Sequence, residues 1–303
     1  MRVFPSLFLA LILLAEPVSV IASDHGGASP LVAPSTGPRN IIFFLGDGMG
    51  PAQVKAYRLF ADDPSTAVID PLPIDRLQVG GVATEAISLV CEEGETTRGC
   101  RRTPYGVSDS AASATAYATG SDTVNGMLAV GPEGTHLTTI LERAAAAGWG
   151  TGVVSTSQVT HASPAAFVAH VSSRQMVHEI ADQFFDNQHD GRPVAQVILG
   201  GGIDDFRRED RDVAAQFVEQ AGYTLLNDRA ELEATDADRL LGLFAPIGLP
   251  RKWDRPDTVP SLADMTSKAI ETLARNEQGF FLFVDGSQID WAAHGNDIAG
   301  VVS

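Results

Sequence analysis

The sequence predicts an α/β fold in which a mostly parallel central sheet is covered by helices on both faces. Two observations predict it. Apolar runs of strand length alternate with helical stretches from Asn40 onward, and this alternation is typical of sheets built from strand–helix–strand units. No internal repeat or clear domain boundary interrupts it, so we expect one domain over residues 39–303. With 303 residues, 44% of them hydrophobic, the chain is large enough for one sizeable core.

The first 22 residues have the three parts of a secretory signal peptide. Arg2 precedes an apolar stretch over residues 7–15, and the small-residue exit ends at Ala22, where we expect cleavage. Residues 23–38 are rich in Ser, Gly, Pro and Ala and are expected to form a flexible lead-in. No later apolar run approaches the roughly 18 residues of a membrane span. We therefore expect an exported protein, periplasmic or extracellular, that does not span a membrane.

The elements of the domain follow one another in a regular order. Ordered structure is expected to begin with a buried strand directly after Asn40, and an alanine-rich helix is expected to open near Ser110. A strand ending near Ser155 precedes a helix that we expect to start at Pro164, because proline favours the first helical position. Residues 203–260 are expected to be less regular, since they are charged and contain a series of prolines. The expected strands are 41–45, 78–84, 152–155, 194–199 and 280–284, and the other expected helices are 52–59, 137–147, 176–185, 212–221 and 263–274.

The excess of acidic residues limits the kinds of molecule that the protein is expected to bind. The chain has 21 Lys and Arg against 38 Asp and Glu, a formal net charge of -17, which argues against nucleic-acid binding through phosphates. An acidic balance is a common background for divalent metals, although most single carboxylates are surface groups. Cys91 and Cys100 flank a polar segment and are expected to close a disulfide loop in an oxidising compartment. Metal ligation and two unpaired thiols are the alternatives.

Two motifs follow the first part of the predicted sheet. Asp47 lies in Gly-Asp-Gly-Met-Gly after a buried strand, where its two oxygens suit a pair of cations and the glycines permit a sharp turn. Ser110 opens the alanine-rich helix, where free N–H groups favour a bound anion and the hydroxyl is placed to attack phosphorus. The alternative for each is a helix cap. The absence of Gly-x-Ser-x-Gly disfavours a Ser-His-Asp esterase.

Two further motifs supply polar side chains. In the segment from Val154 to Arg174, Ser163 offers a hydroxyl to a metal and Arg174 offers a fork for phosphate, unless they are an N-cap and a surface charge. In the segment from Gly279 to Asp297, Asp285 follows a buried strand, and Asp290 and His294 have the i, i+4 spacing of a zinc half-site on a helix. A cap and a partly buried polar residue are the alternatives there, and Asp285 could equally be a turn residue.

Together these motifs resemble the alkaline phosphatase family of secreted, metal-dependent phosphomonoesterases. The matching segments are GDGMG, DSAASATAYATG, HASPA followed by AHVSSR, ILGGG at 198–202, and VDGSQIDWAAH, in that order over residues 40–297. Position by position, the resemblance assigns Ser110 as the phosphorylated nucleophile and Arg174 as the phosphate clamp. It makes Asp47 the ligand shared by zinc and magnesium. The resemblance also places Ser163 and Asp285 at magnesium, Asp290 and His294 at the other zinc, Ser110 beside the metals, and His161 with Ser110 and Arg174 toward the substrate.

The resemblance implies a two-metal phosphoryl transfer with two zinc ions and one magnesium ion. Ser110, activated by a zinc ion near Asp47, would attack phosphorus, and water on the second zinc would hydrolyse the phosphoserine. Small phosphomonoesters are the implied substrates, and a homodimer is usual for the family. Asp285 stands where many members have Glu, and its shorter side chain is expected to weaken or reposition magnesium. His161 and Trp291 resemble the non-enteric and animal-like pattern.

The family's chains continue beyond the region that matches and supply an Asp-His pair and a further His to the zinc ions. We therefore expect this sequence to be the N-terminal part of a longer enzyme, and residues 23–303 alone to bind zinc weakly, to lack phosphatase activity and to aggregate. The alternatives to a phosphomonoesterase are a relative acting on diesters or sulfates, and a secreted protein that binds phosphate or metal without turnover. Ser110 is followed by Ala-Ala-Ser-Ala rather than the sulfatase context, which disfavours a sulfatase.

Overall fold

The computed structural model describes residues 40–91 and 100–303, which belong to one compact unit. The predicted leader and lead-in over residues 1–38 lie outside the described residues. A six-stranded sheet has the order β1-β10-β4-β7-β9-β8, and all of its neighbours are parallel. This confirms the predicted α/β architecture. The strands are β1 Asn40–Leu45, β4 Gly150–Gln158, β7 Val197–Gly201, β8 Thr224–Leu226, β9 Leu240–Leu243 and β10 Phe280–Asp285.

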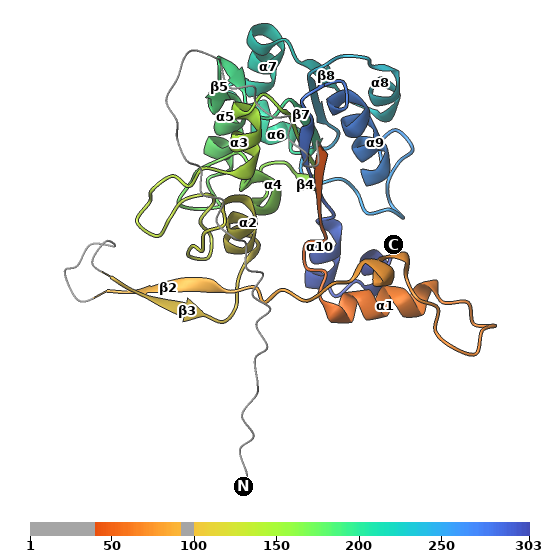
Figure 1. The fold of residues 1–303 in the computed structure, drawn as a ribbon. Helices are drawn as coiled ribbons and strands as arrows, with labels where there is room; N and C mark the ends of the chain where they lie inside the picture. The colour runs from red at the N-terminus through yellow and green to blue at the C-terminus, as the bar shows by residue number, and fades with distance from the viewer. Residues whose placement is uncertain (1–39, 92–99) are drawn as a thin grey trace, which may run out of the picture. The chain divides into compact units, whose positions relative to one another are not determined.

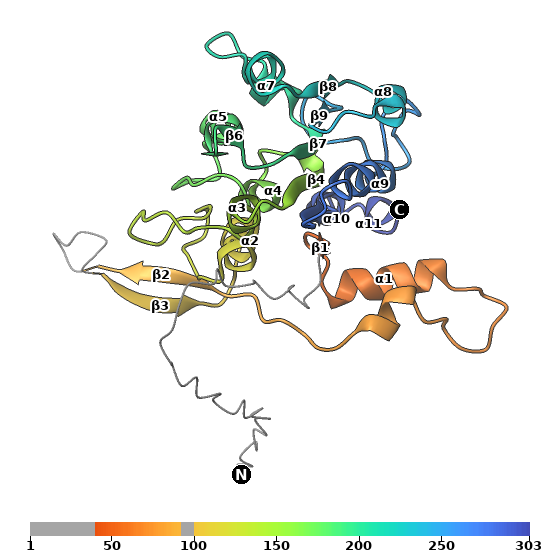
Figure 2. The ribbon, with the colours of Figure 1, turned by 45° about the horizontal axis from the view of Figure 1, so that its top comes forward.

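Helices cover both faces of this sheet, and each face has its own apolar cluster. Figure 2 shows α3, α4 and α5 on one side of the strands and α8 and α9 on the other. Phe167, Phe184 and Phe283 belong to the larger cluster, and Met265 and Leu282 belong to the cluster beneath α9. The helices are α1 Pro51–Ala61, α2 Ser110–Thr119, α3 Ile140–Ala146, α4 Ala162–Ala165, α5 Val177–Asp186, α6 Ile203–Phe206, α7 Val213–Ala221, α8 Arg229–Ala234, α9 Leu262–Leu273, α10 Gln288–His294 and α11 Ile298–Val301.

The last strand of the sheet in sequence, β10, lies between the first strand and β4. Its six residues are buried, in keeping with the continuous apolar run Phe280–Val284 of a strand covered on both faces. In the parallel register Leu45 faces Asp285, and Asp285 faces Ser155 on the other side. Asp285 and Ser155 therefore bring two polar side chains together where β10 ends at the carboxyl edge of the sheet.

The strand expected over residues 78–84 is not present. After a short 3-10 turn at Pro73–Leu77 these residues have no strand partner, and Val79 and Val82 are exposed. The chain forms instead the two-stranded antiparallel hairpin of β2 Ala86–Val90 and β3 Arg101–Tyr105, which projects from the core in Figure 1. The disulfide Cys91–Cys100 joins the two strands, so the predicted pairing is confirmed.

The expectation of irregular structure over residues 203–260 is also wrong in part. Two strands of the main sheet, β8 and β9, lie in this segment, and all four residues of β9 are buried. The prolines follow β9 and lie in the connection to α9, so they interrupt a loop rather than the sheet. A second short hairpin joins β5 Gln188–His189 to β6 Arg192–Pro193.

A buried ion pair ties α3 to the chain that follows α4. The His170 ring lies between two acceptors, with Nδ1 2.9 Å from the carbonyl oxygen of Ala129 and Nε2 2.9 Å from Oε1 of Glu142. The Ala129 carbonyl and an ionised Glu142 can only accept, so this arrangement favours the protonated ring. Glu142 also closes the capping box of α3 with Thr139. The charge pair and the helix cap therefore share one carboxylate.

No helix among the described residues is both long and apolar enough to cross a membrane.

Candidate active site

The carboxyl ends of three adjacent strands carry most of the predicted site residues. β1 ends two residues before Asp47, β10 ends at Asp285, and β4 leads into the segment that holds His161 and Ser163. Loops at this edge of a parallel sheet converge on a crevice, which is why the motifs fall there. The helices α2 and α10 add Ser110 and Asp290. These positions bring residues of all four motifs to one edge of the sheet.

Asp47 is the residue on which two hydroxyl groups converge. Ser110 Oγ lies 3.1 and 3.2 Å from the two carboxylate oxygens of Asp47, and Ser163 Oγ donates to Oδ2 at 3.0 Å. Asp47 is 8% exposed, and Ser163 is fully buried. The Asp47 carboxylate accepts from two hydroxyls that belong to different segments, so it connects the parts of the site and does not act as a helix cap for α1. Gly50, not Asp47, is the N-cap of α1.

The turn that carries Asp47 packs directly against α10. Gly48 has a positive φ of 67°, and a Cβ at this position would lie 2.8 Å from both the Cα and the Oδ1 of Asp290. Only glycine combines this backbone conformation with so close an approach. The Gly-Asp-Gly motif thereby brings Asp47 and Asp290 together from opposite ends of the described chain.

Asp109, not Ser110, caps α2. Its Oδ1 accepts from the amide of Ala112 at 2.9 Å, and its Oδ2 accepts from the amide of Gly126 at 3.0 Å. The same Oδ2 accepts from Nη1 of Arg174 at 3.2 Å. Ser110 is left as the first residue of α2, with its hydroxyl free of capping and directed to Asp47. Asp109 therefore both starts the helix and holds the arginine beside the serine.

His161 binds the second terminal nitrogen of the Arg174 guanidinium. Nη2 of Arg174 donates to Nε2 of His161 at 3.0 Å, and Nδ1 of His161 is buried without a hydrogen-bond partner among the described residues. Burial, together with the Arg174 charge, lowers the pKa of His161 to about 4, so the ring is neutral near pH 7. The ring also meets Trp291 edge-on at 5.6 Å between centroids. Both terminal nitrogens of Arg174 are thus held by hydrogen bonds, Nη1 to Asp109 and Nη2 to His161.

Asp285 is fully buried within a cluster of serines. Its Oδ2 accepts from Ser155 Oγ at 3.0 Å and from Ser287 Oγ, and Ser157 Oγ contacts both of these hydroxyls. Its Oδ1 has no partner in the described part of the chain. Burial raises the pKa of Asp285 to about 7, with the nearby Asp47 charge acting in the same direction. An orphaned, buried carboxylate oxygen indicates room for a ligand that would satisfy it.

Asp290 and His294 lie on one face of α10, as the i, i+4 spacing predicts. His294 Nε2 is 3.5 Å from Asp290 Oδ1, and their side chains are 81% and 19% exposed respectively. Burial and the neighbouring Asp47 raise the pKa of Asp290. Helix α10 therefore presents a carboxylate toward Asp47 and an imidazole toward solvent.

Two local details differ from the sequence expectations. β4 continues to Gln158 instead of ending near Ser155, because Ser155 and Ser157 are buried and their hydroxyls have partners. Ser163 is not the N-cap of a helix starting at Pro164. It is the second residue of α4, whose N-cap is His161. Sequence reasoning missed Ser155 and Ser287 as partners of Asp285, and Ser157 as the residue that contacts both of their hydroxyls. The only signal was that Ser155 and Ser157 stand at alternate positions of a buried strand, and Ser287 follows Asp285 by two residues.

Among the described residues no group of three or more His, Cys, Asp or Glu side chains forms a ready metal cage. The oxygen and nitrogen atoms gathered at this site are nevertheless of the kinds that bind metal cations. Asp47, Ser163 and the unpartnered Oδ1 of Asp285 are hard oxygen donors of the kind that Mg²⁺ prefers. Asp290 and His294 are an oxygen and nitrogen pair of the kind that zinc takes.

Known proteins are similar to this chain in sequence and in fold. The family model described as alkaline phosphatase matches residues 38–303. Alkaline phosphatase 3 of Bacillus subtilis (strain 168) is 42% identical over 265 residues, 88% of this chain and 54% of that protein. The crystal structure of the cold-active alkaline phosphatase from Shewanella sp. has a TM-score of 0.68 and 38% identity, covering 87% of this chain and 60% of that one.

A variant of the alkaline phosphatase from the Antarctic bacterium TAB5 is 27% identical, with a TM-score of 0.66, and is described with Mg bound in its M3 site. The match covers 88% of this chain and 69% of that one. The chain spans about half the length of the curated Bacillus relatives it matches. A family model over nearly all of the described residues, together with this level of identity, is decisive for membership: the chain belongs to the alkaline phosphatase family.

Proposed function

We propose that this protein is a phosphomonoester hydrolase that works through a phosphoserine intermediate on Ser110. One observation carries the proposal. The Ser110 hydroxyl, at the first position of α2, contacts Asp47, while the preceding residue Asp109 binds the guanidinium of Arg174. A nucleophile, a carboxylate and a phosphate-binding fork therefore meet at a helix N-terminus, which favours an anion. Two zinc ions and one magnesium ion belong to the proposal.

The metal ligands that we propose are residues already gathered at this edge of the sheet. Asp47, Ser163 and Asp285 would hold magnesium, Asp290 and His294 would hold one zinc, and Asp47 with Ser110 would border the other. The serine contacts on Oδ2 of Asp285 leave its Oδ1 for a metal, which supports this assignment. When bound, such cations supply charge that favours the ionised serine and the departing oxygen.

The remaining work falls to the protein's own groups. Ser110 Oγ bonds to the phosphorus of the substrate while the ester P–O bond breaks, the serine proton passes to solvent, and the departing oxygen takes up a proton and leaves as the alcohol. Water then breaks the Oγ–P bond, which releases phosphate and restores the serine hydroxyl. Asp47 accepts from the Ser110 hydroxyl and orients it for the attack. Arg174 uses one N–H for Asp109 and one for His161, which fixes the plane of its guanidinium. Its other three N–H groups have no partner among the described residues and would bind phosphoryl oxygens. Neutral His161 accepts from this arginine without adding charge to the site. The N-terminus of α2 adds to the binding of the phosphoryl group, because the positive end of the helix dipole favours an anion.

We also propose that the protein is exported. The disulfide in the β2–β3 hairpin supports this location, because disulfides persist in oxidising compartments. Small phosphomonoesters are the proposed substrates, since Arg174 is held in one plane for the free oxygens of a monoester.

The test is to trap the intermediate in a full-length enzyme that carries this chain. Incubation with a phosphomonoester labelled in its phosphate, followed by acid quenching, is expected to label a peptide that contains Ser110. Ser110→Ala should abolish the label. Ser113→Ala is the matched control, because Ser113 lies about one turn further along the same helix and, within the described part of the chain, its hydroxyl bonds to Ser108 alone. Label that survives in Ser110→Ala, or that is found on another residue, would show the assignment to be wrong.

A further inference from the structure

A cavity lies at the opposite edge of the sheet from Ser110. It has a volume of about 510 Å³, within the range of small-molecule sites. Its lining comes from the segments that enter the strands: Thr151 near the start of β4, Gln196 just before β7 and Arg239 just before β9. The proposed active site is built from the segments that leave these strands. The cavity is therefore a separate site.

The charged lining of this cavity favours an anion. Arg192, Arg239 and Arg275 line it together with Asp190 and Asp238, in a chain whose net charge is -17. Both aspartates have partners, since Asp238 pairs with Arg275 at 3.1 Å and Asp190 lies 3.5 Å from His189. The local balance of formal charge is thus positive within an acidic protein.

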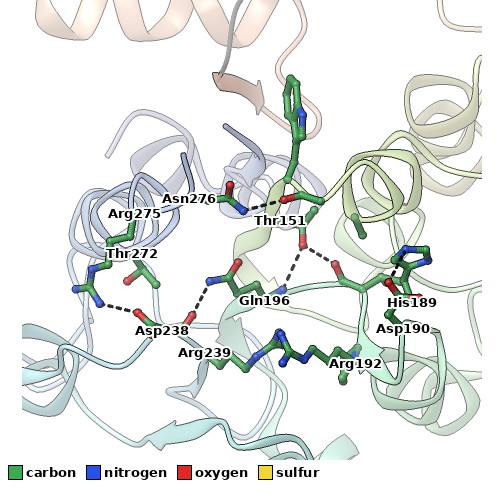
Figure 3. A pocket seen from close by; sticks show the side chains of 15 residues that line it. Thr151, His189, Asp190, Arg192, Gln196, Asp238, Arg239, Thr272, Arg275 and Asn276 are labelled. Carbon is green, nitrogen blue, oxygen red and sulfur yellow. Dashed lines mark hydrogen bonds and ion pairs between the residues drawn. The ribbon is translucent and has the colours of Figure 1, made fainter. Parts of the chain in front are cut away.

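Two of the arginines have no carboxylate partner among the described residues. Arg239 donates to the hydroxyl of Tyr223 at 3.3 Å and lies over its ring, and the side chain of Arg192 makes no hydrogen bond or ion pair with residues 40–91 or 100–303. Figure 3 shows Arg192 and Arg239 extending toward each other across the cavity. Two guanidinium forks directed into one cavity suit the paired oxygens of phosphate or carboxylate groups.

A buried hydroxyl in the same wall also lacks a partner. Thr272 is 1% exposed and lines the cavity, and its Oγ1 makes no hydrogen bond to the described protein. An unsatisfied buried hydroxyl is costly, and a ligand that accepts from it would recover that free energy. Trp149, Pro193 and Val194 supply apolar wall for the body of such a ligand.

We propose that this cavity binds a small organic dianion that carries phosphate or carboxylate groups. Arg192 and Arg239 grip the anionic groups, and the Thr272 hydroxyl contacts the bound molecule. The site uses none of the residues assigned to phosphoryl transfer, so it would stand even if the proposed reaction proved wrong.

The experiment is calorimetric titration of the purified protein with two probes. Phosphonoacetate carries a phosphonate and a carboxylate, and its C–P bond resists phosphatases. Succinate carries two carboxylates. We expect one binding site for at least one probe, and tighter phosphonoacetate binding would identify a phosphate-type ligand whereas tighter succinate binding would identify a dicarboxylate. Arg192→Gln and Arg239→Gln should each lower the affinity about 10-fold or more, the scale of a lost charge-assisted contact.

Three further variants distinguish binding in this cavity from a general effect of charge and from binding at the active site. Arg229→Gln removes the same charge from α8, outside the cavity, and should leave the affinity within about twofold. Arg174→Ala disables the anion fork of the proposed active site and should not change binding. Thr272→Val should weaken binding while leaving the melting temperature unchanged or raised, because its hydroxyl has no protein partner among the described residues. No binding of either probe, an equal loss in Arg229→Gln, or loss in Arg174→Ala would each overturn the proposal.

Discussion

Replacing Glu142 by Gln removes the charge pair between α3 and His170. Glu142 accepts from the Thr139 amide with Oε2 and from His170 and Asn187 with Oε1, whereas glutamine has a single acceptor oxygen. The variant therefore keeps either the capping box or the contacts of Oε1, and it loses the ionic contact with His170 in both cases. A hydrogen bond to a charged partner contributes about 1.5–3 kcal/mol, and the Glu142 side chain is 18% exposed, so we expect about 1.5–2 kcal/mol of lost stability. For a domain of this size that corresponds to a melting temperature about 3–8 °C lower.

The pH dependence of this loss is the sharper test. Burial acts to lower the pKa of His170, but the hydrogen bonds to Glu142 and to the Ala129 carbonyl outweigh it and raise that pKa above 6.5. Burial acts to raise the pKa of Glu142, but hydrogen bonds from His170, Thr139 and Asn187 outweigh it and lower that pKa from 4.5 to about 2. The His170 contribution is complete below pH 6.5 and disappears as pH rises through the raised pKa. The Glu142 contribution is complete above pH 4.5 and disappears as pH falls toward 2.

The assay is therefore thermal unfolding of wild type and Glu142→Gln between about pH 5 and pH 9. The difference between their melting temperatures should be largest near pH 5–6 and should shrink as His170 loses its proton. Glu233→Gln is the control, because Glu233 forms an i, i+4 pair with Arg229 in which both side chains are largely exposed. It should cost at most about 0.5 kcal/mol at any pH. A difference that does not vary with pH, or that matches the control, would refute the buried charge pair.

Three other predictions concern the site and the hairpin. Arg174→Ala in a full-length enzyme should lower monoester turnover by roughly 10- to 1000-fold and diester turnover by less, since a monoester has more free oxygens for the fork. Equal losses on both substrates would make the arginine structural. Ser287→Ala removes a hydrogen bond from Oδ2 of Asp285 and should weaken magnesium binding about 10- to 100-fold, measured by direct metal titration, and unchanged affinity would exclude a positioning role. Mass spectrometry of an unreduced digest should find Cys91 joined to Cys100 in the exported protein, and two alkylatable thiols would contradict this.

The sheet was predictable wherever a strand is a continuous apolar run. The segments over 41–45 and 280–284 are such runs, and both are strands in the structure. The segment over 78–84 misled because its valines suggest a strand, but Gly80 and Gly81 interrupt it and no neighbouring strand pairs with it. The short strand β9 was missed because its four buried residues lie among charged residues and prolines, which dominate the local composition. The local pattern therefore identified strands that are continuous apolar runs, and it failed where the formation of a strand depends on its pairing partner.

The residues of the candidate site were predictable from the sequence, but the hydrogen bonds between them were not. Asp47, Ser110 and Ser163 were selected by motif, and the structure brings their oxygens within hydrogen-bonding distance. Asp109 accepts a hydrogen bond from Arg174, which lies 65 residues later in the chain. No rule based on sequence spacing predicts a contact over this separation. The hydroxyl contacts on Asp285 likewise cross from β10 to β4. Side-chain chemistry can be read from a sequence, whereas the pairing of distant polar groups requires the sheet register.

The position of β10 between β1 and β4 also determines the order in which the site can be assembled. In the described sheet β1 pairs with β10 alone, so it has no partner until the segment around residue 285 has been synthesised, about 240 residues after Asp47. At ribosomal rates of about 5–20 residues per second, that delay is roughly 10–50 seconds. During this interval the apolar segment of β1 has unpaired backbone groups, so it can aggregate with other chains or bind a chaperone. The carboxylate that Ser110 contacts is thus among the last groups to reach its place.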